Sequence, residues 1–235
     1  MRVTKHLFLG TMIITAVMPF VLKQAHAFDM WSFSEIRQSV AQLSETEGPL
    51  FRAASGTEAD AKLAKGAQNF IDNMGSRALG FLANDSLTAE KKAKEFRNLL
   101  EDSFDMRTIA RFALGRYWRT ASDSQRNEYV KLFNKMVIDV YTQRFDEYSG
   151  QKFSVVSARP EGKKDAVVTS VISSPSGPDV QVDWRVRYKN NRYQIVDVIV
   201  EGVSMSLTQR SEFSTVIQRG GGDIEVLLTH LKSRG

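Results

Sequence analysis

The chain has 235 residues, a formal net charge of +5, no cysteine and three histidines. The lack of cysteine excludes disulfides, thiolate catalysis and cysteine-bound metals. A nucleic-acid binder would show a basic stripe with interleaved aromatic residues, and the sequence has none. Only His230 lies beyond residue 27, so we expect neither a catalytic triad nor a histidine-based metal site. No glycine motif of a nucleotide cofactor is present, and no cofactor is expected.

Residues 1–27 have the pattern of a cleaved signal peptide. Arg2 and Lys5 precede a mostly apolar run over residues 7–22, and Ala25 and Ala27 give the small-x-small form of a signal-peptidase site. The run is interrupted and shorter than the roughly 20 residues of a spanning helix, so an uncleaved anchor is the less favoured alternative. We expect export, and the loss of three leader cations lowers the net charge from +5 to +2.

The first part of the mature chain is expected to be helical. Residues 28–57 are interpreted as an N-terminal arm and linker, with a short helix beginning near Ser34. Apolar residues at helical spacing then predict a long helix over residues 58–83. Gly66, Gly75 and Gly80 each weaken it by up to about 1 kcal/mol relative to alanine, so a break near Gly75 is expected.

Three more helices are predicted before residue 150. Thr88 is the expected N-cap of a helix to about residue 103, and Asp105 caps one to about residue 119. Ser122 and Gln125 form a capping box for the longest helix, which is expected to reach about residue 148. Its broad apolar stripe is interpreted as core, as a ligand wall, or as both.

The apolar period then changes from 3.6 to 2, which predicts four strands. They cover residues 153–159, 165–173, 179–189 and 192–200. In the third, the apolar side chains from Val180 to Tyr188 alternate with charged and polar ones, so one face is covered and the other meets water.

Two C-terminal helices follow, capped by Ser206 and by Asp223 and separated by three glycines. Helices followed by antiparallel strands indicate an α+β fold, with the helices packed on one face of the sheet. We expect a single domain over residues 58–235.

Two sequence blocks resemble one protein family. They are FALGRYWRTASDSQR at residues 112–126 and YQIVDVIVEGVSMSLTQRSEF at residues 193–213. With the spacing of helices and strands between them, the similarity covers about residues 105–232. The blocks resemble the MlaC/toluene-tolerance family of periplasmic phospholipid-binding proteins, the soluble component of an ABC-type lipid transport system. The resemblance implies a non-enzymatic carrier that shuttles lipid between the inner and outer membranes and maintains outer-membrane lipid asymmetry.

The resemblance also implies a shape and a set of partners. Members look like a curved sheet wrapped by helices, related to the nuclear-transport-factor-like cone, with an internal apolar pocket for the phospholipid tails and the headgroup outside. The implied partners are an inner-membrane ABC transporter complex and an outer-membrane lipoprotein complex, and the carrier is expected to be a monomer. A hopanoid or other polycyclic lipid is an alternative cargo, because it also needs only an apolar cavity.

Eleven apolar and aromatic residues are the predicted lining of that pocket, and for each the alternative is ordinary core. They are Leu114, Tyr117, Trp118, Val137, Tyr141, Phe145, Trp184, Val186, Tyr188, Val203 and Met205.

Two charged residues are candidates for contact with partner proteins. Arg126 lies in the first turn of the longest predicted helix, where a positive charge opposes the helix dipole, so a local structural reason for arginine is weak; the alternative is a solvated basic residue. Glu201 precedes Gly202 at the corner between the last strand and the next helix. A position at the pocket mouth or in a partner contact is supported there as well as a structural cap.

An enzyme on the same cone fold is the rival class. An isomerase or dehydratase acting on an apolar small molecule requires a buried acid or base, for which Asp197 and Tyr141 are the candidates. Asp197 is alternatively expected to pair with Arg185 or Arg187 across the sheet.

Overall fold

The computed structural model describes residues 57–175 and 177–233. The predicted signal peptide and the arm over residues 28–56 lie outside these residues. Within the described part of the chain, no helix has both the length and the apolar character needed to cross a membrane.

A five-stranded antiparallel sheet forms the centre of the fold. The strands are β1 (Lys152–Glu161), β2 (Asp165–Ser173), β3 (Val180–Lys189), β4 (Arg192–Val200) and β5 (Val203–Ser204), paired in chain order. The four predicted strands are confirmed. The sequence pattern missed β5, because two residues are too few to display an alternation.

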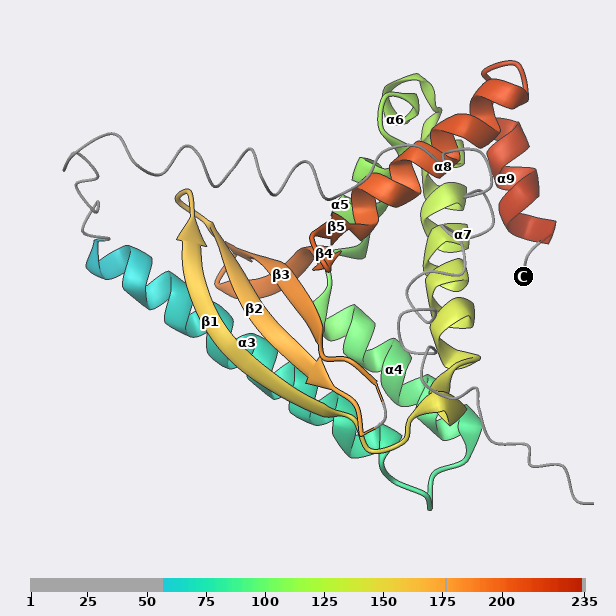
Figure 1. The fold of residues 1–235 in the computed structure, drawn as a ribbon. Coiled ribbons are helices and arrows are strands. Elements are labelled where there is room, and N and C mark those ends of the chain that lie inside the picture. Colours follow the sequence, from blue (N-terminus) through green and yellow to red (C-terminus); the bar gives the residue numbers. More distant parts are fainter. Residues whose placement is uncertain (1–56, 176, 234–235) are drawn as a thin grey trace, which may run out of the picture.

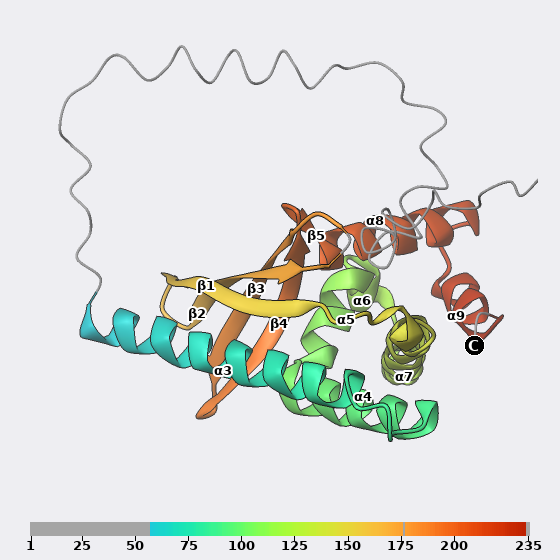
Figure 2. The same ribbon diagram turned by 60° about the horizontal axis from the view of Figure 1, so that its bottom comes forward.

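Helices cover the sheet and extend beyond one end of it. They are α3 (Glu58–Leu82), α4 (Ala89–Ser103), α5 (Met106–Leu114), α6 (Tyr117–Thr120), α7 (Asp123–Thr142), the 3₁₀ turn η2 (Phe145–Glu147), α8 (Met205–Arg219) and α9 (Ile224–Ser233). Figure 1 shows α3 along one face of the sheet and α7, α8 and α9 grouped at the far end. Figure 2 shows the same division, with α4 beside α7. The predicted α+β fold is confirmed.

Three helix boundaries differ from the prediction. The helix after Asp105 ends early, because Gly115 has a φ of 60°, a left-handed conformation that helices do not continue. The longest helix ends at Thr142, and its last apolar turn forms η2 instead. The N-cap of α8 is Ser204 and not Ser206, because the Ser204 hydroxyl accepts the hydrogen bond from the Leu207 N–H.

The expected break near Gly75 is wrong: α3 is continuous across it. A Cβ at Gly75 would lie 2.3 Å from the Phe153 ring, and one at Gly66 would lie 2.0 Å from the Tyr193 hydroxyl. These two glycines therefore allow aromatic rings of the sheet to lie directly on the helix backbone. The packing that they permit offsets their low helix propensity.

Within residues 57–175 and 177–233, the buried side chains form two separate clusters. The helical cluster joins α5, α6, α7, α8 and α9 around Tyr129, Phe133 and Phe213. The sheet cluster joins α3 and α4 to the apolar face of the sheet around Ile71 and Val186.

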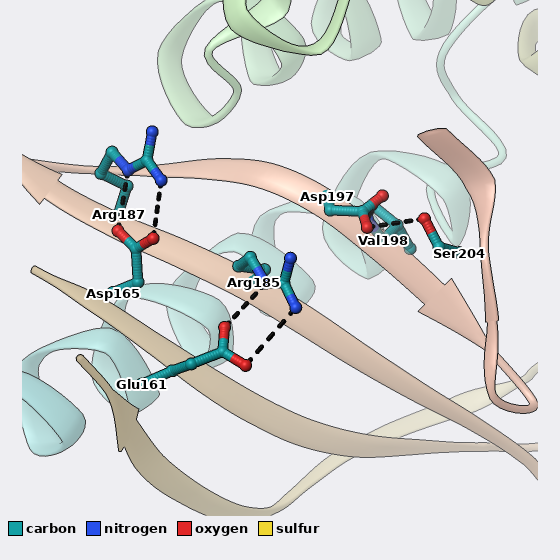
Figure 3. A network of polar contacts seen from close by, with 7 residues as sticks. All are labelled: Glu161, Asp165, Arg185, Arg187, Asp197, Val198 and Ser204. Atoms are coloured by element: carbon teal, nitrogen blue, oxygen red, sulfur yellow. Dashed lines mark hydrogen bonds and ion pairs between the residues drawn. The ribbon is translucent and has the colours of Figure 1, made fainter. Parts of the chain in front are cut away.

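The opposite face of the sheet is polar and crossed by ion pairs, as the alternation in β3 predicts (Figure 3). Arg185 Nε lies 2.8 Å from a Glu161 oxygen, and Arg187 makes two hydrogen bonds to Asp165, of 2.8 and 2.6 Å. Asp165 raises the pKa of Arg187. Arg185 and Asp197 are direct cross-strand neighbours in the register of β3 and β4, as expected. They do not form an ion pair, because the guanidinium groups of Arg185 and Arg187 are directed to carboxylates on the other side of β3.

Candidate functional site

Aromatic side chains are concentrated on the apolar face of the sheet. The Trp184 ring lies edge-on to Phe153, with centroids 6.3 Å apart, and Tyr188 packs on Tyr193 at 4.6 Å. The indole N–H of Trp184 donates to the Ser170 hydroxyl at 2.8 Å, so its one polar atom is satisfied inside an apolar surface. The strand alternation thus directs a row of rings toward α3.

A second aromatic group closes the same space from the side of α4 and α7. Phe96 of α4 lies 5.5 Å from Phe145 in η2 and 5.9 Å from Tyr141 at the end of α7. Phe145 also contacts Phe81 of α3 at 6.1 Å. The early end of α7 matters here, because the 3₁₀ turn places Phe145 against α3 and α4.

The sheet cluster is less completely closed than the helical cluster. Its partly buried members outnumber its buried ones, whereas in the helical cluster most members are buried. Apolar side chains that retain exposed surface gain free energy when an apolar ligand covers them, at about 25 cal/mol per Å². The sheet cluster is therefore the candidate site for an apolar ligand.

Two hollows flank α4 next to this cluster. The first, of about 300 Å³, is lined by Arg77, Gly80, Phe81, Leu87, Glu95 and Leu99. The second, of about 370 Å³, lies between α4 and α7 and is lined by Arg97, Lys131, Asn134, Lys135, Ile138 and Asp139. None of the eleven predicted lining residues borders either hollow.

The eleven residues do not gather in one place. Phe145, Trp184, Val186 and Tyr188 belong to the sheet cluster, and Tyr141 contacts it through Phe96.

The others lie elsewhere. Leu114 and Tyr117 are buried in the helical cluster, and Trp118 and Val137 pack against it. The guanidinium groups of Arg107 and Arg126 also lie 5.6 and 5.7 Å from the centre of the Trp118 ring, within reach of a cation–π contact.

The corner after β4 is a tight turn that is hydrogen-bonded to the start of β3. Glu201 and Gly202, with φ angles of 49° and 79°, form a two-residue turn between Val200 and Val203. The Glu201 carboxylate accepts a hydrogen bond from the Gln181 N–H at the start of β3, so the cap interpretation has direct support. Val203 is 39% exposed.

Asp197 organises the start of α8. One carboxylate oxygen accepts from the Val198 N–H at 2.9 Å, and the other accepts from the Ser204 hydroxyl at 2.7 Å (Figure 3). The first oxygen also accepts from the Ser206 N–H at 3.2 Å. A buried carboxylate at a helix N-terminus is stabilised by these donors and by the helix dipole. Met205 is the first residue of that helix.

The premise for a partner contact at Arg126 is wrong. Its Nε donates to the Trp118 carbonyl at 2.8 Å, one Nη donates to the Arg119 carbonyl at 3.3 Å, and the other donates to Asp123 at 2.9 Å. Arg126 therefore satisfies carbonyls at the end of α6, which sequence spacing alone did not indicate.

Sequence reasoning also missed part of the site. Phe81, Phe96, Phe153 and Tyr193 of the sheet cluster were not among the predicted lining residues. The available signal was the pair of glycines in α3, whose spacing marks where rings of the sheet meet the helix.

Comparison with known proteins agrees with this architecture. Residues 72–233 match the family described as MlaC protein. A solved phospholipid-binding protein from Ralstonia solanacearum, in complex with a phospholipid, has a similar fold, with a TM-score of 0.63 and 22% sequence identity over 72% of this chain and 96% of that one.

Two curated proteins are similar in sequence. A toluene tolerance protein of Pseudomonas putida is 24% identical over 110 residues, 47% of this chain and 51% of its own. The intermembrane phospholipid transport system binding protein MlaC of Haemophilus influenzae is 24% identical over 123 residues, 51% of this chain and 56% of its own. The chain thus spans about half the length of these relatives. Because the family match extends over more than half of the sequence, the chain belongs to the MlaC family.

Proposed function

We propose that this protein is a periplasmic carrier that binds the acyl chains of a phospholipid between the apolar face of the sheet, α3 and α4. The observation that carries the proposal is the incompletely buried sheet cluster, with aromatic side chains on the sheet, α3, α4 and η2. Membership of the MlaC family, with a phospholipid-binding protein among its structural neighbours, supports the same cargo.

The physical reason for a carrier lies in the cost of exposing lipid tails to water. Each exposed methylene costs about 0.8 kcal/mol, so two tails with roughly thirty methylenes would cost on the order of 20 kcal/mol. An apolar binding site removes most of this cost. Because a bilayer and such a site are both apolar, transfer between them is nearly neutral, and direction has to come from partners.

Tail binding requires the aromatic rings to move apart. Phe96, Tyr141 and Phe145 lie at the junction of α4 with the end of α7, where rotation of three rings opens a path to the sheet. Phe153 and Trp184 then supply a flat apolar floor. Each ring that turns exchanges a contact with another ring for a contact with a methylene chain, so opening carries little net cost once the ligand is present.

The cellular role follows from the family. The signal-peptide pattern of residues 1–27 directs the domain over residues 58–235 to the periplasm. An inner-membrane ABC transporter complex and an outer-membrane lipoprotein complex are the partners between which a monomeric carrier shuttles lipid, and this traffic maintains the asymmetry of the outer membrane.

The proposed function is binding and transport without catalysis. Asp197 is engaged by three donors at the start of α8. Desolvation of the Tyr141 hydroxyl raises its pKa, although the residue as a whole is 39% exposed. Neither Asp197 nor Tyr141 is therefore positioned to act as a general base. Among the described residues, no group of acidic or histidine side chains is suited to hold a metal.

Lipid analysis of the purified protein tests the proposal. Organic extraction followed by mass spectrometry is expected to recover a glycerophospholipid in a defined ratio to protein. Recovery of a hopanoid would keep the carrier and change its cargo, and recovery of no lipid under gentle purification would contradict the proposed function.

A further inference from the structure

The hollow between α4 and α7 has an uneven distribution of charge. Lys135 is engaged by Asp139 at 2.6 Å. Arg97 and Lys131 make no ion pair with any residue in the described ranges, and both are exposed at the rim. Two cations are thus available to a ligand that enters this hollow.

Asn134 in the same hollow has an unsatisfied buried atom. Its Oδ1 has no hydrogen-bond partner within residues 57–175 and 177–233. An unpaired buried amide oxygen costs stability unless a ligand or water supplies a donor. The hollow therefore offers two exposed cations to an anionic group. The unsatisfied Oδ1 of Asn134 is buried beneath them, and a donor on the same ligand reaches it only when the Asn134 side chain turns outward.

The hollow also adjoins the apolar site. Lys131, Asn134 and Ile138 follow one face of α7, and the next turn of that face brings Tyr141 against Phe96. On α4, Arg97 directly follows Phe96 in the chain. The α4–α7 hollow is thus one helical turn from the contact between Phe96 and Tyr141, and Phe96 belongs to the sheet cluster.

The hollow on the other side of α4 is less suited to an anion. Its one cation, Arg77, is already paired with Asp102 at 3.0 Å, and the carboxylate of Glu95 faces the same space. A negatively charged ligand there would meet the Glu95 carboxylate, which makes no ion pair with residues 57–175 or 177–233. The α4–α7 hollow instead has a net positive rim.

We propose that the α4–α7 hollow binds the phosphodiester headgroup of the carried lipid. Arg97 and Lys131 hold the anionic phosphate oxygens, and Asn134 accepts a hydrogen bond from the polar part of the headgroup. The acyl chains pass Phe96, Tyr141 and Phe145 into the sheet cluster. This inference rests on the proposed function. It assigns a binding site to the phosphate group, which distinguishes a phospholipid from any other apolar cargo.

A comparison of two lipids with identical tails tests the headgroup site. The delipidated protein is titrated with a phosphatidylethanolamine and with the matching diacylglycerol, which lacks the phosphate, both carrying a fluorescent tail. Charge-assisted hydrogen bonds to a phosphate are worth at least about tenfold in affinity. We expect the phospholipid to bind at least about tenfold more tightly, and an Arg97→Gln/Lys131→Gln variant to lose this preference while it keeps its affinity for diacylglycerol.

Lys94→Gln is the matched control, because Lys94 is an exposed cation on α4 that does not line the hollow. It is expected to keep the preference. If the unmodified protein binds both lipids equally, the headgroup site is wrong and the carrier function stands. If it binds neither lipid, the proposed function itself fails.

A second arm separates a lipid headgroup from a free anion. Inorganic phosphate is titrated while the side-chain amide resonance of Asn134 is followed by NMR. The headgroup assignment predicts a shift of this resonance with phosphatidylethanolamine and a much weaker response to phosphate. A full response to phosphate, with none to the lipid, would overturn the assignment and leave a site for free anions.

Discussion

Replacement of two glycines in α3 by alanine separates packing from helix propensity. A Cβ at Gly75 would lie 2.3 Å from Cδ1 and 2.4 Å from Cε1 of Phe153, whereas a Cβ at Gly80 meets no atom within 4 Å. Both positions lie inside the same helix. The two substitutions therefore share the gain in helix propensity, up to about 1 kcal/mol, and differ in their contact with the sheet.

The magnitude follows from the geometry. The Phe153 ring has to withdraw by about 1.2 Å to restore a carbon–carbon contact of about 3.5 Å, and overpacking of this kind costs about 1–3 kcal/mol. We expect Gly75→Ala to lower the free energy of unfolding by about 1 kcal/mol net and Gly80→Ala to raise it by up to about 1 kcal/mol. Urea titration measures both values. Equal stabilisation by the two substitutions would refute the close approach of Phe153 to the helix.

Three further substitutions test the structural roles of single residues. Arg126→Ala is expected to destabilise the protein by about 1–2 kcal/mol, because the carbonyls of Trp118 and Arg119 lose their donor; an unchanged Tm together with lost partner binding would instead favour the partner contact. Asp197→Asn is expected to lower the free energy of unfolding, measured by urea titration, by about 2 kcal/mol, because an amide cannot accept from three donors. A decrease below about 0.5 kcal/mol would contradict that network. Burial raises the pKa of Tyr129 well above its ordinary value, so stability is intact below about pH 10 and falls above it as the unfolded chain ionises first; Tyr129→Phe should flatten this fall, and an unchanged slope would rule out Tyr129 as its source.

Local patterns predicted the elements well. The alternation in β3 identified both faces of the sheet, and the capping residues Thr88 and Ser122 placed the starts of α4 and α7. Such signals are local, because a cap or a strand period depends only on neighbours in the chain. The predicted N-cap of α8, Ser206, lies two residues after the observed one, Ser204, because both serines are capable N-caps. Asp197, seven residues before Ser204, decides between them through its hydrogen bonds.

The site was harder to predict, because membership of a cavity depends on contacts between distant segments. Tyr117 and Phe145 are both aromatic residues near helix ends, yet one is in the helical cluster and the other in the sheet cluster. Phe145 reaches the sheet cluster only because α7 ends at Thr142. The cations of the α4–α7 hollow come from helices that meet only in the folded protein, so no spacing within one segment identifies Arg97 with Lys131.

Photocrosslinking with a phospholipid that carries a diazirine near the end of one tail tests the central claim most directly. The account predicts covalent adducts on peptides of the sheet cluster, at α3, α4, β1 and β3, and few on α5 or α9 of the helical cluster. Adducts confined to the helical cluster, or spread evenly over the surface, would contradict the placement of the lipid tails between the sheet and α3 and α4.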